Sequence, residues 1–521
     1  MYADRDFAVI PLPEPGEAGV LPDLIQDLEL KTLWEGMAGD DDFLLRVAQS
    51  ATLSSLTSVE QIRFRQQVLD DCLHQPAVVR EMYNLAVEAI AAEKQIYRSL
   101  FSEHGEPLLR RSISAIDMFV GMLRRLRHLA AEHADEFHSA GFRRFFGQVQ
   151  AELDEDYLAE IKAHVKALRF REGLVLSAQL GAGNQGTGYL LRTPGPENRG
   201  SWYSQSILKK PFYSFTIPDR DEAGFRALSE LRDRGLDPVA DAVSQSSAHV
   251  LSFFLALRTE LGFYVGALNL HEKLTDGTAP VCYPDPSPVG QATLTSRDLY
   301  DPCLSLRMGR RAHGNDLDAE GKNLIIVTGA NQGGKSTFLR SMGLAHLMMQ
   351  AGLFVTAASF ASTVTLGVYT HYKREEDATM SSGKFDEELA RMSHIAEQLK
   401  PRCLLMCNES FAATNEREGS DIAAGVIRAM NDAGIRVVFV THMYDLARRY
   451  EDENAPTTLF LRADRGEEGH RTFELHEAAP LPTSFGADLY QRTFYPQQDH
   501  ERDVDRDRHQ DPDHGDPHPR G

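Results

Sequence analysis

Apolar residues recur at three- and four-residue steps over most of residues 21–170, which is the spacing of amphipathic helices packed on a common core. Arg124, Arg125 and Arg127 lie on the other side of one such helix, and for them we favour a solvated helix face over a DNA-binding patch. Helical spacing returns over residues 219–274. The clearest apolar run is Ile116, Phe119, Val120, Leu123, Leu126 and Leu129.

A short β-like insert separates the two helical regions, near residues 168–205. Its centre reads G-A-G-N-Q-G-T-G at residues 181–188 and contains a formal G-x-G-x-x-G. A dinucleotide-binding loop must open a helix, whereas β-prone residues follow this one. The pattern therefore favours a hairpin loop.

The helical pattern ends at a proline cluster within residues 280–288, which predicts the main domain boundary. Beyond it, strand-like and helix-like segments alternate to about residue 496, as in a mainly parallel α/β sheet. The stretch Ser341–Thr370 has no charged residue and is long enough to span a membrane. Because it breaks at Ala351-Gly352 and then becomes β-prone, we predict a buried helix followed by buried strands.

These patterns predict a multidomain chain with four parts. Residues 1–20 form an extended leader, residues 21–275 a mainly α-helical domain that contains the insert, and residues 276–496 an α/β domain. The tail, residues 497–521, has almost no apolar residue and cannot bury a core, so we predict that it is disordered, acidic and rich in histidine.

The composition of the 521 residues is that of a globular protein, with 42% hydrophobic and 25% charged residues. The net charge of -21 repels phosphate backbones, so any contact with DNA must come from local basic patches. Five scattered cysteines and the lack of a secretion signal predict a cytoplasmic protein with no membrane attachment.

Residues 324–340 carry the strongest chemical signal, L-I-I-V-T-G-A-N-Q-G-G-K-S-T-F-L-R. This is the phosphate-binding pattern G-x-x-x-x-G-K-[ST] between an apolar strand and an amphipathic helix. Backbone N–H groups and the helix start would bind phosphate, Lys335 would hold the β- and γ-phosphates, and the Ser336 hydroxyl would ligate Mg²⁺. The predicted nucleotide-binding residues are Gly329, Ala330, Asn331, Gln332, Gly333, Gly334, Lys335, Ser336 and Thr337.

Two further apolar strands end in polar side chains. The run R-C-L-L-M-C-N-E-S at residues 402–410 places Glu409 to orient and activate water and Asn408 in the Mg²⁺ shell. The Asn408 amide brings no negative charge, so we expect weaker Mg²⁺ binding and weak turnover. The strand I-R-V-V-F-V-T-H-M at residues 435–443 ends at His442, which we expect near the γ-phosphate because strand tips gather at one sheet edge.

Together these motifs resemble those of the MutS mismatch-repair ATPase family, an ABC-type branch of the P-loop proteins. T-G-A-N-Q-G-G-K-S-T at 328–337 is similar to the family's T-G-P-N-M-G-G-K-S-T, and N-E-S-F-A-A-T at 408–414 to its D-E-x-G-x-G-T. F-V-T-H-M-Y-D-L at 439–446 resembles A-T-H-Y-x-E-L, and P-T-S-F-G-A-D-L-Y at 482–490 resembles the S-Y-G stretch. The helical residues 58–71 are similar to the family's lever and core domain.

The resemblance implies an ATPase that uses ATP and Mg²⁺ at a composite site between two subunits. M-S-S-G-K-F-D-E-E-L-A-R-M at 380–392 resembles the family's signature segment, so Ser381, Ser382 and Gly383 would act in trans across a homodimer. The implied partner is DNA, in repair or recombination. No amino-terminal F-x-E segment is present and the chain passes from Tyr490 into its tail without a helix-turn-helix. We therefore expect a MutS-related member that lacks the mismatch-binding domain and binds DNA without mismatch specificity.

Two other functions stay open. The first is a nucleotide-gated DNA- or protein-binding module with negligible ATP turnover, which Asn408 favours. The second is a different ABC-like DNA-maintenance ATPase, which would need long coiled-coil arms. The helical segments look too short and too often interrupted for such arms.

Overall fold

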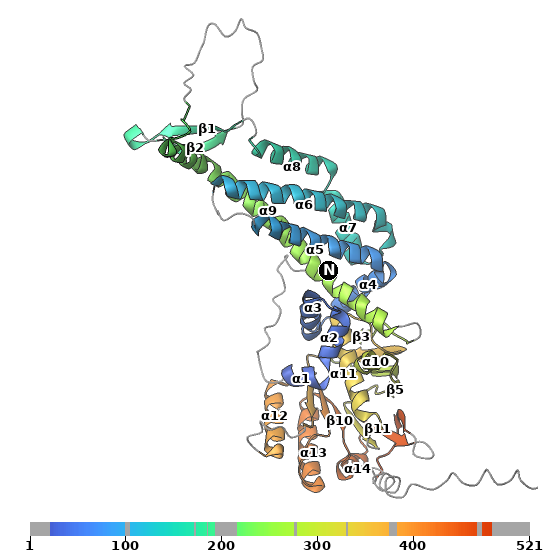
Figure 1. The fold of residues 1–521 in the computed structure, drawn as a ribbon. Coiled ribbons are helices and arrows are strands. Elements are labelled where there is room, and N and C mark those ends of the chain that lie inside the picture. Colours follow the sequence, from blue (N-terminus) through green and yellow to red (C-terminus); the bar gives the residue numbers. More distant parts are fainter. Residues whose placement is uncertain are drawn as a thin grey trace, which may run out of the picture.

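The computed structural model describes residues 21–98, 105–170, 173–184, 186–192, 216–275, 279–329, 332–374, 383–465 and 471–481. The predicted leader and tail lie outside these residues, and so do the 482–490 motif and the later part of the insert. Figure 1 shows two regions: a helical arm, and an α/β region from which the arm extends. The division into domains at the proline cluster stays a prediction.

Helices make up nearly all of the described amino-terminal region, as the periodicity predicts. Asp41, Ser58, Ser139 and Asp154 cap four of these helices with side-chain oxygens that accept backbone N–H groups. The elements are α1 (Leu21–Asp27), α2 (Leu30–Ala38), α3 (Asp42–Leu53), α4 (Val59–His74), α5 (Pro76–Arg98), α6 (Gly105–His133), η1 (Ala134–Glu136), α7 (Ala140–Glu152), α8 (Glu155–Leu168) and α9 (Glu222–Leu274).

The longest helix is α9, which has 53 residues and is about 80 Å long at a rise of about 1.5 Å per residue. It runs from the far end of the arm to the α/β region and packs beside α5 and α6 (Figure 1). The expectation that the helical segments are short and interrupted was therefore wrong. Pro238 lies inside the helix, which continues because its packing against α6 outweighs one lost backbone hydrogen bond.

Helix α9 is also the one helix in the described part of the chain that is long and apolar enough to cross a membrane. Within its most apolar window, 56% of the residues are buried inside the protein. Phe254 stacks on Phe119 of α6 with ring centroids 5.6 Å apart. These contacts make the apolar part of α9 a buried core element of the protein.

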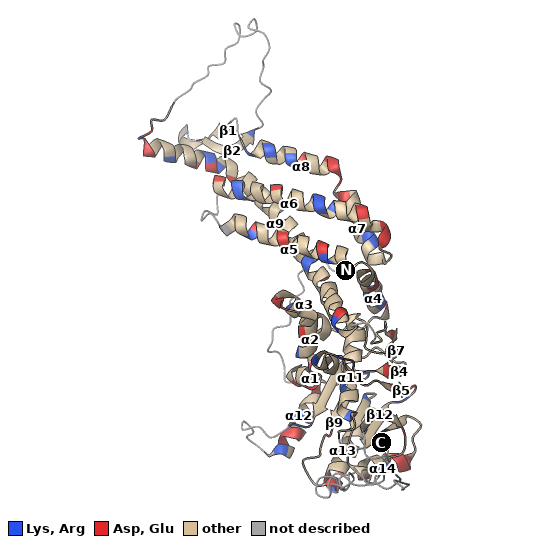
Figure 2. Cartoon of the chain, turned by 45° about the vertical axis from the view of Figure 1, so that its right-hand side comes forward, with Lys and Arg blue, Asp and Glu red and all other residues tan. Residues whose placement is uncertain are grey.

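The arginines of α6 form ion pairs with neighbouring helices. Arg124 and Arg127 lie 3.4 and 3.2 Å from the Glu155 carboxylate at the start of α8, and Arg125 lies 2.7 Å from Glu88 of α5. Figure 2 shows basic and acidic residues interspersed along the arm. The solvated helix face that we favoured for these arginines agrees with this arrangement.

The glycine-rich loop at 181–188 joins two antiparallel strands, β1 (Val175–Leu180) and β2 (Gly186–Arg192), through η2 (Ala182–Asn184). The prediction of a hairpin is confirmed. A strand follows the loop, so the dinucleotide-binding alternative was wrong. The hairpin lies at the far end of the arm (Figure 1).

The α/β region contains two sheets. The larger has the strand order β12-β11-β6-β10-β9-β8, in which every neighbouring pair is parallel except β11 and β12. The smaller has the order β3-β7-β4-β5. The predicted mainly parallel α/β sheet is thus present. The strands are β3 (Asp285–Ser287), β4 (Leu294–Leu299), β5 (Asn315–Asp318), β6 (Leu324–Gly329), β7 (Ser359–Thr363), β8 (Val368–Tyr372), β9 (Leu404–Asn408), β10 (Arg436–Val440), β11 (Thr458–Arg465) and β12 (Arg471–Glu477).

The helices of this region are α10 (Pro302–Met308), α11 (Lys335–Ala351), α12 (Lys384–Gln398), α13 (Glu416–Asp432) and α14 (Tyr444–Glu453). Helix α11 is almost entirely buried, and β7 and β8 follow it. The prediction of a buried helix followed by buried strands in the uncharged stretch is confirmed.

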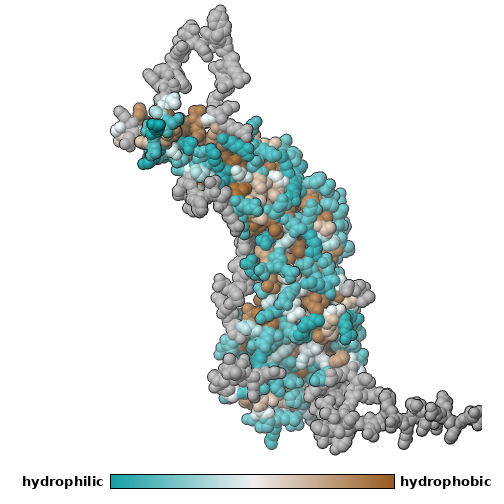
Figure 3. Space-filling view, viewed as in Figure 1, coloured by the Kyte–Doolittle hydropathy of each residue, from teal (hydrophilic) through white to brown (hydrophobic). Residues whose placement is uncertain are grey.

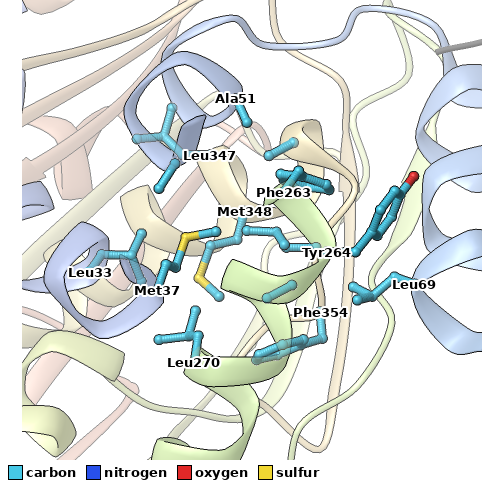
Figure 4. Packing of buried hydrophobic residues seen from close by; sticks show 14 of the residues in the cluster. Leu33, Met37, Ala51, Leu69, Phe263, Tyr264, Leu270, Leu347, Met348 and Phe354 are labelled. Atoms are coloured by element: carbon cyan, nitrogen blue, oxygen red, sulfur yellow. The ribbon is translucent and has the colours of Figure 1, made fainter. Parts of the chain in front are cut away.

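One hydrophobic cluster runs without a break from the arm into the larger sheet. Figure 4 shows Leu33 and Met37 of α2, Leu270 of α9 and Met348 of α11 packed together. The face shown in Figure 3 is mostly hydrophilic where it is coloured, with scattered apolar residues.

Ion pairs tie the first helix to the α/β region. The Arg374 guanidinium lies 2.9 Å from the Asp23 carboxylate and 2.6 Å from that of Asp27. Arg340 of α11 pairs with Glu29 and with Asp301. Helices α1 to α3 are therefore fixed between the arm and the two sheets.

Candidate nucleotide site

The predicted site residues come from the carboxyl ends of three adjacent strands. Strand β10 lies between β6 and β9 and is parallel to both, so the ends of all three meet at one edge of the sheet. Strand β6 leads into the phosphate loop, β9 ends at Asn408, and β10 ends two residues before His442. This edge is where ligands of open α/β sheets bind.

The phosphate loop begins with a glycine that no other residue could replace without strain. Gly329 has φ 111°, and a Cβ atom there would lie 2.3 Å from the carbonyl oxygen of Ala463 in β11. Gly334, with φ 89°, caps the start of α11. Gln332 is exposed beside them with φ 61°, whereas Ala330 and Asn331 lie outside the described residues. The start of α11 thus presents its backbone N–H groups and positive dipole end to the loop.

Lys335 is buried, with 5% of its surface exposed, and its Nζ atom donates a hydrogen bond to the Gly329 carbonyl oxygen at 3.0 Å. Burial lowers the pKa of this ammonium group, and the negative charge of Glu409 acts in the opposite direction. A bound phosphate would supply further negative charge and favour the ammonium form.

Ser336 and Asn408, the two predicted Mg²⁺-shell residues, face each other. The Ser336 hydroxyl donates to the Asn408 amide oxygen at 3.1 Å. In the described part of the chain no three His, Cys, Asp or Glu side chains gather as a metal site. Mg²⁺ takes oxygen ligands and in nucleotide sites is held by one or two protein groups and the phosphates. The oxygens of Ser336 and Asn408 fit an ion held mainly by the nucleotide.

Glu409 and His442, the two predicted catalytic residues, are also neighbours. The His442 Nδ1 atom lies 4.0 Å from a Glu409 carboxylate oxygen, and the two side chains are 40% and 30% exposed. The Glu409 backbone N–H donates to Val440 of β10 at 2.9 Å, which ties the ends of the two strands together. Both side chains are accessible to a ligand at the sheet edge.

A cavity of about 790 Å³ opens beside the phosphate loop. Its lining includes Lys335, Ser336 and Glu409, together with Phe473 of β12 and the loop that ends at Asn315. The volume is within the range of small-molecule sites. The rest of the lining is Asp298, Leu304, Met308, Arg310, Arg311, Ala312, His313, Gly314, Gln332, Gly334, Thr337, Phe338 and Ser341.

Sequence reasoning missed Phe473 and the loop that ends at Asn315. Phe473 and Leu475 alternate as core residues of a strand do, but Phe473 has φ 59° and is 42% exposed at the cavity. Asn315 holds it there, because its side chain donates to the Phe473 carbonyl at 3.2 Å and accepts from the Leu475 N–H at 2.7 Å. Arg311 is fixed by the Asp298 carboxylate and lies over the Tyr300 ring. No local motif marks these residues.

Of the predicted trans residues, only Gly383 is described. It is exposed, precedes α12, and does not line the cavity. Ser381 and Ser382 lie outside the described residues. The action of the three residues across a dimer stays a prediction.

The fold and the site define a protein in which a helical region joins an α/β region with a candidate nucleotide site. Residues 57–277 match the MutS2 N-terminal domain, and residues 325–502 match MutS domain V, which is the ATPase domain of MutS proteins. The chain is a MutS-related protein.

Several DNA mismatch repair proteins MutS are similar to this chain. That of Chloroflexus aurantiacus is 30% identical over 196 residues, which cover 37% of this chain and 19% of that protein. That of Caulobacter vibrioides is 35% identical over 179 residues (33% and 20%), and that of Methanosarcina acetivorans 25% over 224 residues (42% and 25%). The similarity thus spans a quarter or less of these relatives' own length.

Proposed function

We propose that this protein binds and hydrolyses ATP at a composite site in a homodimer and couples this reaction to DNA binding in repair or recombination. The observation that carries the proposal is the meeting of Lys335, Ser336, Asn408 and Glu409 at one sheet edge beside a cavity of about 790 Å³. These two pairs of neighbouring residues, remote from each other in the sequence, have the chemistry for a triphosphate, its metal ion and a water molecule.

Each residue has a distinct task in the proposed reaction. The amides at the start of α11 and the Lys335 ammonium bind the phosphates, and bound Mg²⁺ supplies positive charge that stabilises the reacting phosphoryl group. Ser336 and Asn408 would hold that ion. Glu409 orients the attacking water and accepts its proton, and His442 lies beside that carboxylate near the γ-phosphate. Phe473, which lines the same cavity, offers an exposed ring for stacking of the base.

The test is Mg²⁺-dependent phosphate release by the wild-type protein and by Lys335→Ala. We expect the variant to lose turnover and to bind ATP more weakly, because its loop lacks the cation. Lys400→Ala is the matched control, since Lys400 is exposed and remote from the cavity. Equal rates for wild type and Lys335→Ala, at or above background, would end the proposal that this site is an ATPase.

A second function is favoured by Asn408. Without a carboxylate next to Ser336, the site could bind ATP and act as a nucleotide-gated DNA- or protein-binding module with negligible turnover. ATP binding that depends on Lys335, together with phosphate release that is the same in wild type and Glu409→Gln, would establish this function instead.

DNA as the partner rests on the relationship to MutS proteins, and a cytoplasmic location is part of the same proposal. The 53-residue helix α9 gives the arm the reach to follow a duplex. Because the net charge is -21, contacts must be local. We would measure binding to branched, mismatched and plain duplexes over a salt series, expecting a steep salt dependence and no preference for mismatches. Undetectable binding to every form would indicate a protein partner.

A further inference from the structure

The turn that carries Glu409 has an unusual backbone. Glu409 and Phe411 have φ of 54° and 63°, a left-handed conformation that non-glycine residues seldom adopt. Two such residues on either side of Ser410 need outside contacts to stay in place. The direction of the Glu409 carboxylate therefore depends on what holds this turn.

Besides the bond from the Glu409 N–H to Val440 of β10, the contacts that hold the turn come from β8 and α12. The Phe411 N–H donates to the Glu388 carboxylate on α12 at 2.7 Å. The Ser410 hydroxyl lies 2.7 Å from the carbonyl oxygen of His371 and 2.7 Å from its ring Nδ1. The His371 ring also stacks on Phe411, with centroids 5.6 Å apart, and its Nε2 lies 3.1 Å from the Glu388 carbonyl. All four residues are buried.

Burial of the Glu388 carboxyl group costs free energy of folding. It occupies the apolar stripe of α12 with Met392 and Ile395, at steps of four and three residues where the helix pattern calls for a hydrophobic side chain. It is 5% exposed, and its second carboxylate oxygen has no hydrogen-bond partner among the described residues. Burial raises the pKa of this carboxyl group. An apolar residue here would pack better but would leave the Phe411 N–H unpaired.

We propose that Glu388 is a positioning residue for the reaction: its bond to the Phe411 N–H holds the 409–411 turn and so aims Glu409 at the attacking water. This inference rests on the proposed ATPase function. It also ties α12, which begins directly after the predicted trans residue Gly383, to the catalytic glutamate of the same subunit.

The experiment compares Glu388→Ala, which removes the acceptor, with Glu388→Gln, which keeps a carbonyl oxygen for Phe411. Glu397→Ala, an exposed glutamate of the same helix, is the control. A displacement of about 1 Å in a catalytic group can cost about 100-fold in rate. We expect kcat to fall at least about tenfold in Glu388→Ala, with the KM for ATP and ATP binding unchanged, and near-complete rescue in Glu388→Gln.

Hydrogen exchange of a peptide spanning residues 405–414 gives a readout that does not need turnover. We expect faster exchange in Glu388→Ala and wild-type protection in Glu388→Gln and Glu397→Ala. Unchanged kcat and exchange in Glu388→Ala would overturn the inference, as would equal losses of kcat and ATP binding. If the wild type lacks turnover that depends on Lys335, the proposed function fails, and the exchange result alone decides whether Glu388 holds the turn.

Discussion

Gly329 is the position where a single added methyl group tests the geometry of the phosphate loop. It is the last residue of β6, pairs with Ala463 of β11, and has φ 111°. In Gly329→Ala, the new Cβ would lie 2.3 Å from the Ala463 carbonyl oxygen and 2.7 Å from its nitrogen. These are backbone atoms of a paired strand, so a side-chain rotation cannot relieve the contact.

The loss of stability expected in Gly329→Ala has two causes. A non-glycine residue in a sparsely populated backbone region costs about 1–3 kcal/mol. Overpacking against atoms that cannot move costs typically about 1–3 kcal/mol more. We therefore expect Gly329→Ala to lose about 2–6 kcal/mol of stability and to lower the thermal midpoint by ~2 °C or more. ATP binding should weaken as well, because relief requires β6 and the loop to move.

Thermal unfolding followed by circular dichroism, with and without ATP, measures both effects. The matched control is Gly425→Ala, in the exposed middle of α13, where nothing lies within 4 Å of the new methyl group. That change should be neutral or stabilise by about 0.5–1 kcal/mol, because alanine loses less entropy in a helix than glycine. If Gly329→Ala melts at the same temperature as the wild type, the pairing of β6 with β11 is not as described.

Three more predictions concern a buried acid, the metal site and the core. Burial raises the pKa of Asp27 to about 6, so its contribution to stability is fully present below about pH 4 and is lost as the pH rises through 6. Between those limits the free energy of unfolding of the wild type should fall by up to roughly 3 kcal/mol, whereas that of Asp27→Asn should not. Parallel pH profiles of the two proteins in chemical denaturation would contradict this. Asn408→Asp should lower the Mg²⁺ concentration needed for ATP binding at least about tenfold, because the added negative charge faces Ser336. If the Mg²⁺ titration is unchanged, residue 408 is not a ligand in the Mg²⁺ shell. Leu270→Ala should cost about 2–5 kcal/mol in thermal or chemical unfolding, and a loss under 1 kcal/mol would mean that its site is not the packed core in Figure 4.

The elements of the fold could be predicted because each has a strong local period. The apolar stripe of α6 and the continuous apolar runs of β6, β9 and β10 belong to one helix and three buried parallel strands. The continuity of α9 through Pro238 could not be predicted, since the packing of α5 and α6 against it decides that point. Nor could the docking of α1, because Asp23 and Arg374 are 351 residues apart in the chain.

The phosphate side of the site could be predicted for a geometric reason. Parallel strands place their carboxyl ends at one edge, so the polar residues that follow β6, β9 and β10 had to come together. The strand order itself, with β10 between the other two, could not be predicted from the sequence. The part of the lining formed by Phe473 depends on its left-handed backbone and on the hydrogen bond from Asn315 of another sheet, and neither has a local pattern.

The docking of α1 to α3 between the arm and the sheets bears on how the protein can be dissected. A fragment that starts at the proline cluster would keep every residue of the phosphate loop. It would also expose buried apolar side chains of α11. Arg340 would lose its ion pair with Glu29, and Arg374 would lose its ion pairs with Asp23 and Asp27. Such a fragment should aggregate, and one that keeps residues 21–53 would still need the end of α9, because Leu270 packs against Leu33 and Met37 of α2.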